Sequence, residues 1–218
     1  MEIDGWSDAD VTAQRYGLPG DLLMSQEPFS ILAVCTGNVC RSPAVERLLA
    51  SKLGPTVAVT SAGTHALVGH PISDPMAALL TDSGIEPDSF EARRLSENML
   101  KEADLVLTMT RAQRGLVVEL WPPAVRRAFT LREFARLLSA VDPAALPAGP
   151  PAERLGAAIP LAAAGRGRQR MSPEEDDVVD PFRLSNAVYA ASFAQIRSAA
   201  ETVVYTIVIN QPNRQPQV

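Results

Sequence analysis

The nine residues CTGNVCRSP, numbered 35–43, place a nucleophile and a cation in one short segment. The segment holds both cysteines of the chain, and five residues separate Cys35 from Arg41. A loop that closes onto a helix N-terminus turns backbone N–H groups inward and adds the positive end of the helix dipole, which makes an anion site. That field favours the thiolate of Cys35, and the Arg41 guanidinium matches two phosphate oxygens. These residue types therefore predict phosphoryl transfer to a cysteine.

The whole loop is expected to contact the phosphate, through Thr36, Gly37, Asn38, Val39, Cys40, Arg41 and Ser42. Gly37 would let the backbone approach the ligand closely, and Asn38 would fix the loop through side-chain hydrogen bonds. Two interpretations of Ser42 stay open: its hydroxyl caps the helix only, or it also donates to the Cys35 thiolate. Cys-x5-Arg alone is a weak signal, but a preceding strand and a following Ser-Pro helix start make it a strong one.

Strands alternate with helices along the chain, which predicts a parallel sheet joined by right-handed crossovers. Apolar runs predict strands over residues 29–34, 56–63, 103–110 and 126–131. Helices are expected to begin at Ser42-Pro43 and Asp74-Pro75 and to cover residues 111–120, 132–138 and 185–209. Parallel sheets bind ligands at the carboxyl ends of their strands, and Cys35 lies at the end of the first strand.

The length of 218 residues and the hydrophobic content of 46% predict one domain, over residues 28–210. Residues 1–27 and 211–218 are expected to be a loosely held extension and tail. Between about residues 139 and 177 the pattern dissolves into Pro, Ala, Gly and Arg, which predicts an insertion outside the core. A lid, a docking element and inert padding are all open roles for it.

Composition excludes several classes of function. A net charge of −5 without a basic block argues against nucleic-acid binding, and no apolar run is long enough to span a membrane. The acidic N-terminus is not a signal peptide, so a cytoplasmic protein is expected, in which paired cysteines are reactive rather than structural. The only histidines, His65 and His70, have no recognised ligand spacing, so neither a metal nor a cofactor is expected. The sequence carries no signal of oligomeric state.

The segment CTGNVCRSP resembles the phosphate-binding loop of the low-molecular-weight protein tyrosine phosphatases, whose fold is shared by bacterial arginine phosphatases and some arsenate reductases. The resemblance covers about residues 29–138 and 178–208, through SAGT (61–64), DP (74–75), ADLVLTM (103–109) and DPF (180–182). It implies an α/β, flavodoxin-like, four-stranded parallel sheet with helices on both faces. It also implies hydrolysis of phosphomonoesters through a cysteinyl-phosphate.

Three residues match the catalytic positions of that family. Cys35 matches the nucleophile, Arg41 the phosphate-binding arginine, and Asp180 the general acid that protonates the leaving oxygen. Asp180 has a plainer interpretation, as the residue that opens the last helix, and Asp176 or Asp177 is a competing acid. The ordered helix after Asp180 favours Asp180.

The second cysteine, Cys40, has two open interpretations. It is either a small buried loop residue or, as the resemblance implies, the partner of Cys35 in a reversible disulfide that protects the nucleophile from over-oxidation.

Val39, Leu67 and Phe182 are expected to line the substrate cleft. Val39 stands where tyrosine phosphatases typically have isoleucine and arginine phosphatases have threonine, which favours an aromatic ring over a guanidinium. Leu67 replaces a cleft aromatic, and Phe90 replaces a histidine that often supports the loop asparagine. A phosphotyrosine protein is therefore the first choice of substrate, a small phosphomonoester the second, and phosphoarginine the third.

Two other functions compete with hydrolysis. A relay arsenate reductase would need cysteines beyond Cys40 or an external thiol. A phosphoprotein-binding module without catalysis is disfavoured because Cys35, Arg41 and Asp180 are all present.

Overall fold

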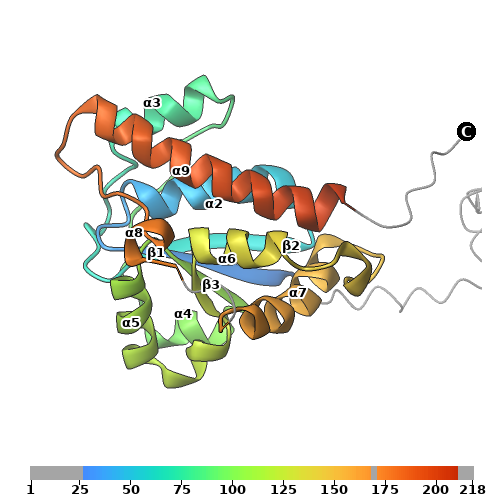
Figure 1. Cartoon of the computed structure of the whole chain (residues 1–218). Coiled ribbons are helices and arrows are strands. Elements are labelled where there is room, and N and C mark those ends of the chain that lie inside the picture. The colour runs from blue at the N-terminus through green and yellow to red at the C-terminus, as the bar shows by residue number, and fades with distance from the viewer. Residues whose placement is uncertain (1–26, 168–170, 211–218) are drawn as a thin grey trace, which may run out of the picture.

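The computed structural model of the protein describes residues 27–167 and 171–210 and centres on one parallel sheet (Figure 1). Four strands lie in the order β2-β1-β3-β4, and every pairing is parallel. The strands are β1 Phe29–Cys35, β2 Val57–Gly63, β3 Leu105–Thr108 and β4 Ala128–Thr130. Each lies within or overlaps a predicted strand, and the flavodoxin-like fold class is confirmed.

The α-helices of the described residues are α2 Arg41–Leu53, α3 Asp74–Asp82, α4 Glu97–Glu102, α5 Arg111–Leu120, α6 Leu131–Ser139, α7 Pro151–Gly165, α8 Pro173–Asp176 and α9 Asn186–Val204. Shorter helical turns are η1 Pro122–Arg126, η2 Pro143–Ala145 and η3 Tyr205–Ile209. The predicted helices over 111–120, 132–138 and 185–209 are confirmed within a few residues. The short helix α4 and the long helix α7 were not predicted.

Both faces of the sheet are covered, as predicted (Figure 1). Alternate side chains of β1 enter two separate apolar clusters, because a strand points successive residues to opposite faces. Ile31 and Ala33 pack with residues of α2, α6 and α9, whereas Leu32 and Val34 pack with residues of α4 and α5.

The carboxyl ends of β1, β2 and β3 meet at one edge of the sheet. Cys35 pairs with Gly63 of β2, and the preceding residue Val34 pairs with Thr108 of β3. The chain moves from β1 to one neighbour and later returns to the other side, so the loop after β1 lies where the strand order reverses. Open α/β sheets bind ligands at such a point.

The expectation that residues 139–177 contribute nothing to the core is wrong, because α7 is a core helix. Leu155, Ala158 and Ala162 are fully buried in the cluster on the α6 and α9 face. Arg154 is also fully buried, and its guanidinium donates to four backbone carbonyl oxygens at 2.7–2.9 Å, those of Pro147, Thr206, Ile207 and Asn210. The arginine thereby satisfies the C-terminal end of the last helix.

The predicted extension and tail fall mainly on residues 1–26 and 211–218, which lie outside the described residues. Within the described ranges, none of the helices combines the length and the hydropathy that crossing a membrane requires.

Leu155→Ala tests whether α7 belongs to the core. Removing a fully buried leucine should lower the free energy of unfolding by about 2–5 kcal/mol, because a cavity is left behind. Leu161→Ala on the same helix is the control; that side chain is 38% exposed, so its loss should be below about 1 kcal/mol. Urea unfolding measures both, and equal losses would contradict a core role for α7.

Candidate active site

The loop after β1 is held by the loop after β2. The carbonyl oxygens of Cys35, Thr36 and Gly37 accept hydrogen bonds from the backbone N–H groups of residues 64, 65 and 67 at 2.9–3.0 Å. The carbonyl of Val39 accepts from residue 73 at 2.8 Å. Because these carbonyls are bonded to the neighbouring loop, the concave side of the first loop is left to N–H groups. That is the arrangement an anion requires.

Gly63 is required at the closest approach of the two loops. A Cβ on this residue would lie 2.5 Å from the carbonyl oxygen of Thr36 and 3.0 Å from the Cβ of Asn38. No side chain fits there without moving the backbone. At Gly37, by contrast, a Cβ would meet only Val39 at 3.5 Å, an ordinary contact, so its expected role toward the ligand stays a prediction.

A chain of hydrogen bonds leads from Glu46 to the thiol of Cys35. Ser61 Oγ donates to Glu46 Oε2 at 2.6 Å, and Asn38 Nδ2 donates to both Ser61 Oγ at 2.8 Å and Ser42 Oγ at 2.9 Å. Ser42 Oγ lies 3.0 Å from Cys35 Sγ. Since the Ser42 oxygen already accepts from Asn38, its hydrogen is available to the sulfur. The backbone N–H of Asn38 donates to the same sulfur at 3.2 Å, so two hydrogen-bond donors converge on Cys35 Sγ.

Ser42 does not cap α2, so one of its two interpretations is wrong. The helix begins at Arg41, its N-cap is Cys40, and no side chain bonds to the first turn. The hydroxyl contacts the thiol instead.

Asn38 adopts a left-handed backbone conformation with φ of 56°, which asparagine tolerates better than most residues. Its Oδ1 accepts from the backbone N–H of Arg93 at 2.8 Å. Ser61 and the Arg93 backbone therefore support the asparagine.

Arg41 and Asp180 meet at the mouth of the loop. Arg41 is buried with 4% of its side chain exposed, whereas 53% of the Asp180 side chain is exposed. Arg41 donates from Nη2 to Asp180 Oδ2 at 2.5 Å and from Nη1 to the carbonyl of Val178 at 3.3 Å. The ion pair brings a residue from the start of α2 to one 139 positions away.

Nearly all of the predicted site residues line one cavity of about 140 Å³. Its walls are Cys35, Thr36, Gly37, Val39, Cys40, Arg41, His65, Leu67, Asp180 and Phe182. Leu67 is 37% exposed and Phe182 is 40% exposed, so both lie at the rim, and Val39 is buried. Asn38 and Ser42 lie behind the cavity and act on it through Cys35. The sequence did not predict His65 as a lining residue.

Residues 176–180, called here the acid segment, are anchored by the buried carboxylate of Asp176. Arg111 Nη2 lies 2.5 Å from Asp176 Oδ2, and Arg136 Nη2 lies 2.9 Å from Oδ1. Burial raises the pKa of the Asp176 carboxyl, but the hydrogen bonds from Arg111 and Arg136 outweigh it, so the pKa lies below its usual range. An ionised, fully engaged carboxylate is a poor proton donor.

Backbone contacts fix the rest of the acid segment. Asp177 Oδ1 accepts from the backbone N–H of Arg111 at 2.7 Å, which places it at the start of α5. The N–H of Val178 donates to the Met109 carbonyl at 2.8 Å, and Ser192 of α9 donates to the Val179 carbonyl at 2.9 Å. Asp180 does not open the last helix either, because α9 begins at Asn186. Of the three aspartates, Asp180 is the one that contacts Arg41.

Cys40 lines the same cavity as Cys35, and both are buried free thiols. Its Sγ is 3.1 Å from Ser73 Oγ and 3.6 Å from the hydroxyl of Tyr189. Burial raises the pKa of the Cys40 thiol above its usual value, although the bonds to Ser73 and Tyr189 oppose that shift. Both interpretations of Cys40 stay predictions.

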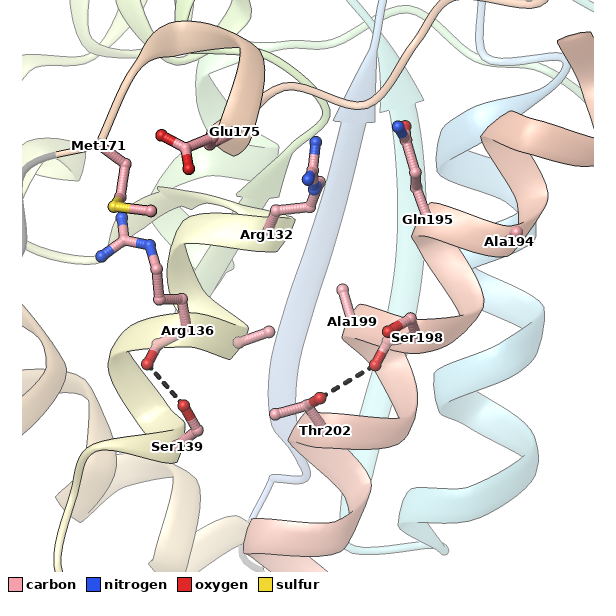
Figure 2. Close-up of a pocket in the computed structure, with 11 residues that line it drawn as sticks. Arg132, Arg136, Ser139, Met171, Glu175, Ala194, Gln195, Ser198, Ala199 and Thr202 are labelled. Carbon is pink, nitrogen blue, oxygen red and sulfur yellow. Dashed lines mark hydrogen bonds between the residues drawn. The ribbon is translucent and has the colours of Figure 1, made fainter.

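A larger hollow, of about 670 Å³, lies between α6 and α9 (Figure 2). Arg132 and Arg136 of α6 face Gln195 and Thr202 of α9 across it, with Glu175 of α8 above. Neither cysteine lines it. Arg132 also donates to the carbonyl of Asp177 at 2.7 Å, so these arginines hold the acid segment from behind. Chemistry rather than size identifies the smaller cavity as the candidate active site.

Metal ligands do not cluster in the part of the chain that the structure describes. Across residues 27–167 and 171–210, no three His, Cys, Asp or Glu side chains are grouped so that they could hold a metal ion.

Comparison with known proteins identifies relatives of this chain. Residues 30–143 match the family model described as low molecular weight phosphotyrosine protein phosphatase. The low molecular weight protein-tyrosine-phosphatase Etp of Escherichia coli K12 is 42% identical over 100 residues, which are 45% of this chain and 67% of the relative. The protein-arginine-phosphatase of Geobacillus stearothermophilus is 39% identical over 107 residues, which are 49% of this chain and 72% of the relative.

Solved structures agree with this. The YwlE arginine phosphatase from Geobacillus stearothermophilus has a TM-score of 0.60 at 29% identity, with 81% of this chain and 91% of that one covered. The tyrosine phosphatase amsI of Erwinia amylovora has a TM-score of 0.62 over 85% of this chain and 97% of that one. Its identity of 22% shows a shared fold alone.

Ser42→Ala tests the hydrogen bond to the thiol. Losing a donor to a charged sulfur should lower the rate of Cys35 alkylation by iodoacetamide at neutral pH about tenfold, because fewer thiolates are present. Mass spectrometry of the alkylated peptide measures the rate and separates Cys35 from Cys40. Ser51→Ala is the control, because Ser51 bonds only to its own helix at Leu48. An unchanged Cys35 rate in Ser42→Ala would contradict the hydrogen-bond assignment.

Proposed function

The chain belongs to the low molecular weight phosphotyrosine protein phosphatase family of cysteine-dependent phosphatases, and we propose that Cys35 is the nucleophile with which it attacks the phosphorus of its substrate. The observation that carries the proposal is the convergence of Cys35, Arg41 and Asp180 on one cavity. Attack by the sulfur forms a cysteinyl-phosphate and breaks the bond between phosphorus and the leaving oxygen.

The loop stabilises charge on the phosphoryl oxygens. Backbone N–H groups are turned to the concave side, and the Arg41 guanidinium offers a planar fork to two oxygens. Arg41 now donates to Asp180 and to the Val178 carbonyl, so binding the phosphate exchanges the Asp180 partner for phosphate oxygens.

Asp180 gives its proton to the leaving oxygen. When the phosphate takes the place of Asp180 at Arg41, the Asp180 carboxyl group leaves its ion pair and can turn toward the leaving oxygen. After the leaving group departs, the Asp180 carboxylate takes a proton from water. That water attacks the phosphorus and releases the Cys35 thiolate.

A phosphotyrosine protein is the substrate that the rim favours. Leu67 and Phe182 offer exposed apolar surface beside the cavity, and Val39 adds two methyl groups inside it. An aromatic ring gains more from such walls than a polar head group does.

Phosphoarginine is the second candidate, because the arginine phosphatase from Geobacillus stearothermophilus is about as similar in sequence to this chain as the tyrosine phosphatase Etp is. Against it, Val39 offers no hydrogen bond to a guanidinium, and an unsatisfied buried donor costs about 1–3 kcal/mol. A small-molecule phosphomonoester is the alternative substrate if the enzyme does not act on proteins.

We place the enzyme in the cytoplasm. Its two cysteines are free, and a reducing compartment keeps a nucleophilic thiol active.

Asp180→Asn tests the general acid. For an alkyl phosphate, whose leaving group needs a proton, kcat should fall by about 10²–10⁴. For p-nitrophenyl phosphate, whose leaving group is already a stable anion, the fall should be about tenfold or less. Steady-state kinetics on both substrates gives the comparison, and equal losses would assign the proton to another group.

Two further variants complete this experiment. Cys35→Ser should abolish turnover of both substrates while phosphate still binds, and retained turnover would refute the nucleophile. Asp142→Asn changes a carboxylate that caps η2 outside the cavity, so it should leave both rates unaltered.

Val39→Thr tests the substrate choice. Adding a hydroxyl where a methyl group stands should raise kcat/KM for phosphoarginine peptides relative to phosphotyrosine peptides about fivefold or more, because a guanidinium gains a partner. Val68→Thr is the control, since Val68 is 63% exposed and does not line the cavity. A wild type that already prefers phosphoarginine, with no change in Val39→Thr, would overturn the selectivity argument.

A further inference from the structure

A much larger groove adjoins the catalytic cavity. The cavity measures about 140 Å³ and the groove about 690 Å³. They share Thr36, Arg41, His65 and Asp180, so a substrate whose phosphoryl group lies on the loop can extend past these residues into the groove. Sites for whole small ligands usually measure about 300–1,000 Å³, so the cavity alone holds only the head of a substrate.

The groove has two dissimilar walls. One is built by the loop after β2 and the first turns of α5, including Thr64, Gln113 and Leu116. The other is the acid segment with the preceding helix α8, including Glu174 and Val179. Leu116 is 42% exposed and Val179 is 40% exposed, so each wall offers an apolar surface to an occupant.

Carboxylates dominate the charge of the groove. Glu174 and Asp177 line it, and among its described lining residues Arg41 is the only arginine or lysine. Asp180 lines it too, but it is the proton donor in the proposed mechanism, so it is not counted as a charge here. Arg41 is committed to the phosphate in the proposed mechanism, so it does not neutralise the groove. Hydrogen bonds from its own backbone N–H and from Ser172 lower the pKa of Glu174, so this exposed side chain is ionised at neutral pH.

We propose that this groove binds the polypeptide beside the phosphorylated residue, and that its acidic wall selects a basic side chain there. The proposal rests on the phosphatase function proposed above and narrows its substrate to a protein with a basic flank. Continuity with the catalytic cavity argues for a chain that extends from the phosphorylated side chain. The exposed leucine and valine fit the carbon stem of a lysine or arginine, and the carboxylates fit its charged end.

A phosphorylated metabolite fits the same groove poorly. Such molecules are compact, and the charges they carry besides the phosphate are commonly negative or absent. The carboxylates of the groove would repel additional negative charge, and the apolar surfaces of Leu116 and Val179 would stay uncovered.

The experiment uses synthetic phosphotyrosine peptides that differ only in lysine, alanine or glutamate at each flanking position in turn. At one or more flanking positions, the kcat/KM of the wild-type enzyme should be about three- to tenfold higher for the peptide with lysine than for the peptide with glutamate at low salt. Exposed ion pairs contribute about this much. The preference should shrink as ionic strength rises. In Glu174→Lys the lysine-to-glutamate ratio should fall to about one or reverse. Because the ratio is taken within each variant, a general loss of activity cancels.

Glu119→Lys is the matched control, since it makes the same charge change on α5 at an exposed residue that does not line the groove. Its lysine-to-glutamate ratio should equal that of the wild type. A ratio near one at every flanking position in the wild type would overturn the groove assignment, and so would an equal shift in both variants. A small phosphomonoester turned over with a higher kcat/KM than every peptide would also overturn it. If the enzyme hydrolysed neither the peptides nor p-nitrophenyl phosphate, the proposed phosphatase function itself would be refuted.

Discussion

The contact between the loops after β1 and β2 is the constraint on which the site depends. Four backbone N–H groups of the second loop bind the outward carbonyls of the first, and Gly63 permits the approach because a Cβ would collide with the Thr36 carbonyl. If the loops separated, those carbonyls would have to turn to water or to the ligand, and the anion site would lose its N–H groups. The parallel pairing of β1 with β2 up to Cys35 and Gly63 sets the two loops side by side, so the sheet fixes the geometry of the candidate site.

The candidate site is built from two segments, the loop after β1 and the acid segment, which are anchored in different ways. The phosphate loop is held by backbone hydrogen bonds and by the chain from Glu46 through Asn38 to Cys35. The acid segment is held by charge, with the Asp176 carboxylate fixed between Arg111 and Arg136. Asp180 extends from this anchored segment and is still half exposed. A fixed backbone with a half-exposed carboxylate suits the proposed role, in which Asp180 first pairs with Arg41 and then approaches a substrate oxygen.

The sequence predicts structure that adjacent residues determine, whereas it does not predict contacts between segments that lie far apart along the chain. The strand before Cys35, the loop after it and the helix that follows could be predicted, because adjacent residues determine them. The support of Asn38 by Ser61 and the Arg93 backbone depends on how the loop after β2 folds back, and adjacent residues do not encode that path. The cap expected of Ser42 is absent because the helix starts two residues earlier than predicted, and the hydroxyl contacts the thiol instead. The sequence leaves Asp176 as a competitor of Asp180 for the role of proton donor, and only the structure shows that Asp176 is buried between two arginines.

The helix α7 was not predicted from the sequence, because its many alanines and its prolines give only a weak apolar stripe. The residues at its two ends nevertheless bind backbone groups of the sheet and of the last helix. β4 is an edge strand, and its outer backbone groups would otherwise be open to another strand. Arg166, directly after α7, donates to the Ala128 carbonyl at 2.5 Å and lies 3.9 Å from the ring of Phe129. At its other end, Arg154 binds the carbonyls that finish the last helix. Both arginines act on main-chain carbonyl oxygens, which exist whatever the side chain. A segment rich in alanine and proline can therefore be anchored to the core by two arginines, although its composition alone predicts a loop.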